Sequence, residues 1–126
     1  MTDPSDTPAG PTLWLTVPEA AERLDVRLTR VHQMVKSGAL LAVRRDGVWK
    51  LPAELVPDLR SPAGRTSNLA RHLTGVLTVL RDAGYSADEA LDWLYTPDET
   101  LPEGTPAAAL GQRPTEVKRR AQALGF

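Results

Sequence analysis

The 126-residue sequence predicts a mainly α-helical protein with one β-hairpin near its N-terminal end. Two observations predict this class. Apolar residues recur at helical spacing in several stretches that begin at Ser, Thr or Pro and end at Gly or Pro. One Asp-Gly pair, Asp46 followed by Gly47, lies between two short apolar runs, which is a strong hairpin pattern.

The first predicted helix begins at Thr16. Thr16 and Glu19 have the T-x-x-E spacing of a capping box, in which each side chain accepts a hydrogen bond from the other residue's backbone N–H. Pro18 lies in the first turn, where its missing N–H costs no helical hydrogen bond. The helix is expected to break at Asp25 and Val26, between two separate apolar stripes.

A second helix is predicted over residues 28–37, with Gly38 as its stop. Leu28, Val31 and Val35 recur on one face, so the opposite face is left to polar residues. The exposed side is expected to contain Thr29, Arg30, Gln33 and Lys36.

A basic hairpin is predicted over residues 42–51, because its Asp-Gly turn adopts positive φ angles easily. Arg44 and Arg45 precede the turn, and Lys50 follows it. Helix, turn, helix and basic hairpin is the element order of a winged helix-turn-helix, in which the hairpin is the wing.

Four segments are expected along the chain. Residues 1–12 are rich in proline and have no large apolar side chain after Met1, which is typical of a disordered tail. The winged helix-turn-helix is assigned to residues 13–56. Residues 57–67, rich in Pro, Gly and Ser, are assigned to a linker, and residues 68–126 to a C-terminal helical bundle.

The C-terminal bundle is predicted to contain three or four helices. The longest runs from Leu69 to about Ala83, where the apolar repeat ends. A second begins at Ser86, which forms another capping box. Further helices are expected to begin at Pro106 and Pro114.

Two apolar cores are expected, with the alternative that they are fused into one. The first is predicted to contain Trp14, Leu24, Val31, Val35, Leu41, Val43 and Leu51. The second is predicted to contain Leu73, Val76, Leu77, Leu80, Leu91, Trp93, Leu94, Val117 and Leu124.

Charge is segregated along the chain, although the formal net charge is only −1. Residues 27–50 carry six bases and one acid, whereas residues 82–104 carry seven acids and no base. Local charge decides phosphate binding, because salt screens electrostatic attraction within about 10 Å. The basic stretch coincides with the second helix and the hairpin, and therefore predicts phosphate binding there. The alternative is that these are ordinary solvated faces.

The element order predicts binding to double-stranded DNA, with helix 28–37 in the major groove and hairpin 42–51 on the backbone. Gln33 can read adenine, while Arg30 and Lys36 can bind phosphate or guanine. The predicted DNA-binding residues are Arg27, Thr29, Arg30, Gln33, Lys36, Arg44, Arg45 and Lys50. The alternative is a helix-turn-helix used only for contacts with protein.

No catalytic, cofactor or metal site is predicted, and the chain is not expected to be an enzyme. It has no cysteine, and its two histidines, His32 and His72, lie in different segments. Asp88, Glu89 and Asp92 lie in a capped helix start, where acids favour the helix dipole. The absence of cysteine, of a secretory pattern and of a long apolar run favours a cytoplasmic, nucleoid-associated protein without membrane contact.

Thr7 in the predicted tail is a candidate phosphorylation site. A phosphate would add roughly −1.5 to −2 charge close to a phosphate-binding surface. We therefore expect phosphorylation to oppose DNA binding.

The stretch 16–52 resembles the winged helix of excisionases and MerR-type proteins, which opens T-x-x-E-A-A-x-x-L-G-V and ends its recognition helix in S-G. Over residues 13–126 the chain resembles small actinobacterial winged-helix DNA-binding regulators. This resemblance implies DNA binding and a role in transcription regulation. The matching residues are Thr16, Glu19, Ala20, Ala21, Leu24, Val26, Val31, Ser37 and Gly38.

Two positions depart from that pattern. Arg27 stands where a serine usually caps the recognition helix, and a missing cap costs on the order of 1 kcal/mol. Leu28 stands where a polar or basic residue is common, and leucine cannot donate to a base. We therefore expect backbone contacts to dominate the affinity.

The second half of the chain is similar to the helical domain of antitoxins paired with RES-type toxins. The pattern is W-L-x-x-P-[ND]-x-x-L-x-G-x-x-P, here with one extra residue before Gly104. The resemblance implies a homodimer or protein-partner surface within residues 68–126, and an antitoxin-like inhibitor as the alternative function. The matching residues are Trp93, Leu94, Pro97, Asp98, Leu101, Gly104 and Pro106.

Overall fold

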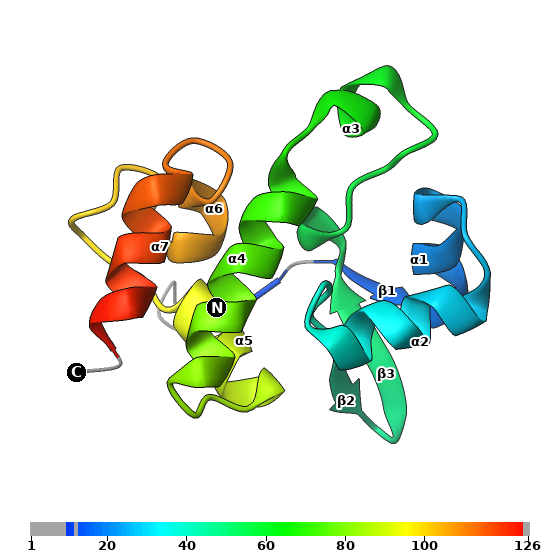
Figure 1. Ribbon diagram of the computed structural model, residues 1–126, viewed down its shortest axis with the longest axis horizontal. Helices are drawn as coiled ribbons and strands as arrows, with labels where there is room; N and C mark the ends of the chain where they lie inside the picture. Colours follow the sequence, from blue (N-terminus) through cyan, green and yellow to red (C-terminus); the bar gives the residue numbers. More distant parts are fainter. Residues whose placement is uncertain (1–9, 12, 125–126) are drawn as a thin grey trace, which may run out of the picture.

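The computed structural model describes residues 10–11 and 13–124, and the candidate site Thr7 lies outside them. These residues form seven α-helices, one 3-10 helix and a three-stranded antiparallel sheet (Figure 1). The predicted class, a mainly α protein with a winged helix-turn-helix followed by a helical bundle, is confirmed. The elements are β1 (Trp14–Thr16), α1 (Val17–Leu24), α2 (Leu28–Ser37), β2 (Val43–Arg45), β3 (Val48–Pro52), η2 (Ala53–Leu55), α3 (Pro62–Thr66), α4 (Leu69–Asp82), α5 (Ala87–Tyr95), α6 (Pro106–Ala109) and α7 (Pro114–Ala123).

The helix-turn-helix follows from local capping. The backbone N–H of Thr16 donates to Glu19 Oε1 at 2.8 Å, and the Glu19 N–H donates to Thr16 Oγ1 at 3.4 Å, so the predicted capping box is present. Helix α1 ends at Asp25, whose φ of 55° is left-handed and turns the chain towards α2. Helix α2 begins after Arg27 without a side-chain cap, as the sequence predicts.

The hairpin is a two-residue turn between β2 and β3. Asp46 and Gly47 have φ angles of 55° and 78°, which match the twist of the paired strands. Strand β3 also pairs with β1, so the sheet order is β1-β3-β2. Strand β1 was not predicted, because three residues give too short a pattern for periodicity to detect.

The two faces of this small sheet pack against different halves of the protein. Leu15 and Leu51, which face each other across β1 and β3, pack with α1 and α2 in an N-terminal core. Val43 lies on the opposite face and packs with α4, α5 and α7 in a C-terminal core. Leu41 and Leu55 join the same C-terminal core. Trp14, partly buried, also packs against this core. The prediction that Trp14, Leu41 and Val43 belong to the first core is therefore wrong.

The C-terminal core is centred on α4, which has α7 on one side and the sheet with α2 on the other (Figure 1). The Tyr95 hydroxyl in α5 donates to Glu54 Oε1 in η2 at 2.6 Å, which adds a polar contact between the halves. Burial, together with this carboxylate, raises the pKa of Tyr95 far above its ordinary value. Leu124, predicted in the core, is 38% exposed, so that prediction is wrong.

None of the helices in the described ranges is both long enough and apolar enough to span a membrane.

Candidate nucleic-acid interface

The outer face of α2 carries a row of polar side chains. Val31 is fully buried in the N-terminal core and sets which face of the helix is covered. Thr29, Gln33 and Lys36 have i, i+4 and i+7 spacing, so they form one row roughly opposite Val31. All three are exposed, as the sequence predicts. This row is a surface that a nucleic-acid groove can meet.

The flanks of α2 differ in what they face. His32 turns towards the hairpin, and its ring makes an edge-on contact with Trp49 at a centroid distance of 6.0 Å. Arg30 is two residues earlier, about 200° around the helix, so it points away from the hairpin flank. Arg30 and His32 are both exposed. The hairpin therefore extends one flank of the row, while Arg30 marks the other flank.

The C-terminal end of α2 is held by α4. Gly38 caps α2 with a φ of 85°, and the Arg81 guanidinium lies over it. A Cβ at position 38 would be 2.7 Å from Arg81 Nη2. The Thr74 hydroxyl also donates to the Ala39 carbonyl at 3.4 Å. These contacts orient the row, and the Arg81 cation suits the negative end of the helix dipole.

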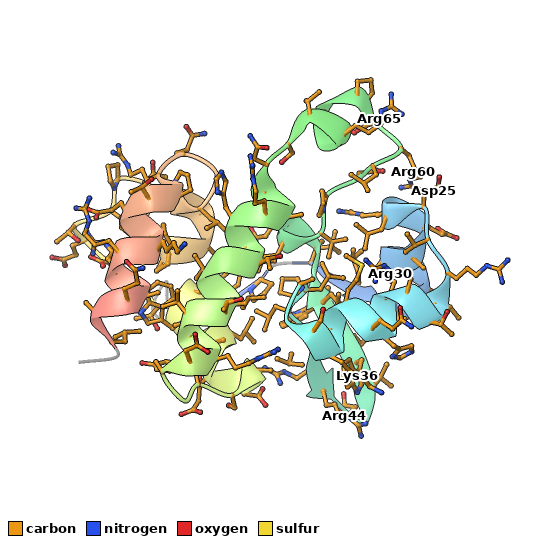
Figure 2. All side chains as sticks on the ribbon, viewed as in Figure 1. Asp25, Arg30, Lys36, Arg44, Arg60 and Arg65 are labelled. Atoms are coloured by element: carbon orange, nitrogen blue, oxygen red, sulfur yellow. The ribbon has the colours of Figure 1, made fainter. Side chains whose placement is uncertain are left out.

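Arg44 lies on the recognition side of the hairpin. It is opposite Trp49 in the strand register, and its guanidinium carbon is 5.8 Å from the Trp49 ring centroid. Trp49 in turn contacts His32 of α2. Figure 2 shows Arg44 and Lys36 at the same end of the molecule. The structure thus brings Arg44 together with the outer row of α2.

Arg45 lies on the opposite face of the hairpin, because neighbouring residues of a strand alternate in direction. Its Nη1 is 3.0 Å from Asp88 Oδ1 in α5, and its guanidinium carbon is 5.7 Å from the Trp14 ring centroid. The structure therefore does not place Arg45 beside Arg44. Its predicted DNA contact stays a prediction, and such a contact would compete with Asp88.

Lys50 shares the face of Arg45. It is opposite Thr16 in β1 and Val43 in β2, and it is half-buried. Hydrogen bonds from Thr16 lower the pKa of Glu19, and the Lys50 charge lowers it further. Lys50 therefore lies in the electrostatic field of an α1 carboxylate and apart from the α2 row. Its predicted DNA contact is likewise untested.

Sequence reasoning passed over two exposed arginines, Arg60 and Arg65, because residues 57–67 were assigned to a linker. That segment contains the helix α3. A signal was present in the composition, since residues 57–81 carry four arginines and one acid. Figure 2 shows Arg60 and Arg65 on the other side of α2 from Lys36 and Arg44.

Within residues 10–11 and 13–124, no group of three or more His, Asp or Glu side chains could hold a metal ion. Glu89 in α5 and Asp98, which follows α5, have structural partners instead. Ser86 and Glu89 form the predicted capping box, whose hydrogen bonds lower the pKa of Glu89. Asp98 accepts hydrogen bonds from Thr100 and pairs with Arg120 at 2.6 Å, and its pKa is lowered by these contacts.

Comparison with known proteins gives two family matches. Residues 6–56 match the model described as DNA-binding protein Rv2175c, winged helix-turn-helix domain, and residues 70–125 match the Rv2175c C-terminal domain of unknown function. The chain is 34% identical over 122 residues to DNA-binding protein Rv2175c of Mycobacterium tuberculosis strain H37Rv. The aligned region covers 87% of this chain and 79% of that protein. The NMR structure of Rv2175c is similar with a TM-score of 0.73 and 31% identity, over 100% of this chain and 86% of the other.

Proposed function

Because this chain belongs to the Rv2175c family, whose first domain is a winged helix-turn-helix of a DNA-binding protein, we propose that it binds double-stranded DNA and regulates transcription. The observation that carries this proposal is the exposed row of Thr29, Gln33 and Lys36 on α2, with Arg44 beside it. A bulky hydrophobic face or a buried row at this position would have favoured a packing role. The row is instead polar and open.

In this mechanism α2 enters the major groove and its polar row faces the base edges. Gln33 has the amide geometry that pairs with adenine, and Thr29 can contact a base or a phosphate. Lys36 and Arg44 supply positive charge where α2 meets the hairpin. Arg30 on the other flank can reach guanine or phosphate.

The two departures at the start of α2 limit base reading. Arg27 is exposed at the N-cap position and makes no capping hydrogen bond, so its guanidinium is available to phosphate. Leu28 is 47% exposed and has no hydrogen-bond donor in its side chain. We therefore expect phosphate contacts to supply most of the affinity, and the affinity to depend strongly on salt.

The test is selection of bound sequences from a random DNA pool with the full-length protein, followed by salt titration on the selected site. We expect log affinity to fall linearly with log salt, with a slope of about −0.9 for each phosphate neutralised. Arg30→Ala and Arg44→Ala should each reduce the slope by about one unit. Arg119→Ala, in α7 on the far side of α4, is the control and should leave the slope unchanged. Salt-independent binding, or no selected sequence, would contradict the proposal.

We also propose that a second copy or a protein partner binds through residues 68–126, because one winged helix covers only a short site. Sedimentation of the protein alone and on its selected DNA tests this idea, and two half-sites in the footprint are expected for a homodimer.

DNA binding by this route needs no catalytic group, so we assign no enzyme activity. Such a regulator would act in the cytoplasm, on the nucleoid. The similarity to excisionases, MerR-type proteins and antitoxins is limited to short sequence motifs.

Phosphorylation of Thr7 remains a proposal about residues that the structure does not describe. The modified protein should bind its selected DNA more weakly, because the added charge repels the DNA phosphates. A Thr7→Ala variant, treated with the kinase that modifies the wild-type protein, should keep its affinity for the DNA. Equal affinity of the modified and unmodified wild-type proteins would contradict this role.

A further inference from the structure

We propose that residues 58–66, called here the α3 loop, form a second phosphate-binding element that flanks α2 on the side opposite the hairpin. Its ligand is the sugar–phosphate backbone of the same double-stranded DNA, bound through Arg65 and Arg60. The inference rests on the DNA binding proposed above, and it goes further by assigning DNA contacts to a segment outside both matched family domains.

The α3 loop has an ordered internal structure. The Ser61 hydroxyl donates to the Asp58 carbonyl at 3.0 Å and accepts from the Gly64 N–H at 3.1 Å. A Cβ at position 64 would lie 1.8 Å from the Asp58 carbonyl oxygen, so only glycine allows the loop to close this tightly. The backbone therefore presents Arg60 and Arg65 from a closed turn, which lowers the entropy lost when they bind a ligand.

The α3 loop is attached to the helix-turn-helix. The Leu59 N–H donates to the Arg23 carbonyl near the end of α1 at 2.7 Å, and the Leu59 side chain packs on the N-terminal core. Arg23 in turn donates from Nη1 to the Ala53 carbonyl at 3.1 Å. Because Arg23 lies two residues before the Asp25 break, these bonds hold the α3 loop beside the turn that leads into α2.

The charges of the α3 loop are open to solvent. Arg65 is exposed and forms no ion pair within the described part of the chain. Arg60 is held by Asp58 through two bonds, from Nε at 2.9 Å and from Nη2 at 3.0 Å. This pairing orients the Arg60 guanidinium but offsets its charge. Arg65 is therefore the main phosphate ligand, and Arg60 is the second.

The cations lie in the order expected for a helix placed between two phosphate strands. Figure 2 shows Arg65 and Arg60 at one end of the view, Arg30 on α2 between, and Lys36 with Arg44 at the other end. A helix in the major groove, which is about 12 Å wide, lies between two phosphate strands. The hairpin can neutralise one strand, and the α3 loop has the charge and the position to neutralise the other. Arg30 lies on the flank of α2 away from the hairpin, which continues the positive surface.

The experiment uses the full-length protein on its selected DNA, with hydroxyl-radical footprinting and salt titration. Arg65→Ala should reduce the slope of log affinity against log salt by about 0.9. It should also remove backbone protection at one edge of the footprint, while Arg44→Ala removes it at the opposite edge. Asp58→Asn should strengthen binding, because it releases the charge of Arg60.

Gly64→Ala provides a second test that keeps every charge. The added methyl group must displace the Asp58 carbonyl, so the same edge of the footprint should weaken while the thermal transition stays cooperative. Wild-type footprints and slopes in both Arg65→Ala and Gly64→Ala would overturn the role of the α3 loop and leave the proposed function intact. Failure of the wild-type protein to bind any DNA would overturn the proposed function and this inference with it.

Discussion

Arg45 in the hairpin and Asp88 in α5 form an ion pair, with Arg45 Nη1 and Asp88 Oδ1 3.0 Å apart. Arg44, its neighbour in sequence, has its guanidinium carbon 5.8 Å from the ring centroid of Trp49, on the side of α2. The two arginines are adjacent in the chain and serve different surfaces. One extends the candidate DNA interface, and the other connects the hairpin to the C-terminal helices.

This division predicts different effects of the two arginines on DNA binding. Arg44→Ala should reduce the salt slope by about 0.9, because it removes a free cation beside α2. Arg45→Ala should change the slope much less, since Asp88 already offsets its charge. Salt titrations of both variants on one DNA site make the comparison. Equal slope changes would mean that Arg45 leaves Asp88 when DNA binds.

Gly38→Ala should destabilise the protein. The left-handed φ of 85° costs an alanine roughly 1–2 kcal/mol, and the new methyl group also meets the Arg81 guanidinium. Urea unfolding measures the loss, and Gly111→Ala is the control because a Cβ at Gly111 meets nothing within 4 Å. The double variant with Arg81→Ala separates the backbone cost from the contact. A stability equal to that of the control would contradict the role of Gly38 as the cap of α2.

Arg27→Ser should raise stability and weaken DNA binding together. A serine at this N-cap can accept a hydrogen bond from the first turn of α2, which is worth about 1 kcal/mol. The same change removes a cation at the start of the recognition helix. Arg27→Ala is the matched control, because it loses the cation without adding a cap. If the serine variant melts no higher than the alanine variant, the cap does not form.

Asp58 should titrate well below an ordinary aspartate. Hydrogen bonds from Arg60 lower its pKa from 3.8 to about 2. Because the pKa of Asp58 is lower in the folded than in the unfolded state, its ionised form stabilises the folded protein at pH values above the unfolded-state pKa. This stabilisation is lost as the pH falls towards 2. Arg60→Ala should return the pKa towards 3.8. A titration of the carboxyl carbon by NMR checks both values, and an unchanged pKa in the variant would mean that the pair does not form in solution.

Much of the secondary structure could be predicted because its signals are local. The capping boxes at Thr16 and Ser86 mark helix starts through contacts within three residues. The Asp46 and Gly47 turn defines the hairpin, and Gly38 stops α2. The exposed row on α2 follows from helical periodicity alone.

What the sequence did not show are the contacts between distant residues. Val43 was assigned to the wrong core, because strand alternation shows that two faces exist but does not show what covers each face. The same alternation separates Arg44 from Arg45. Residues 57–67 were assigned to a linker from their composition. Their attachment to α1 could not be predicted, because the bond from Leu59 to Arg23 joins positions 36 residues apart in the sequence.

The sequence by itself determined the helices, the hairpin and the polar row on α2, because caps, turns and periodicity act over a few residues. Only the tertiary structure decided which cations share a surface. The packing of α4 and α5 against the sheet draws Arg45 to Asp88, and the closed turn around Gly64 brings Arg60 and Arg65 beside the helix-turn-helix. The physical reason is that the direction of a side chain depends on which distant element buries its neighbours.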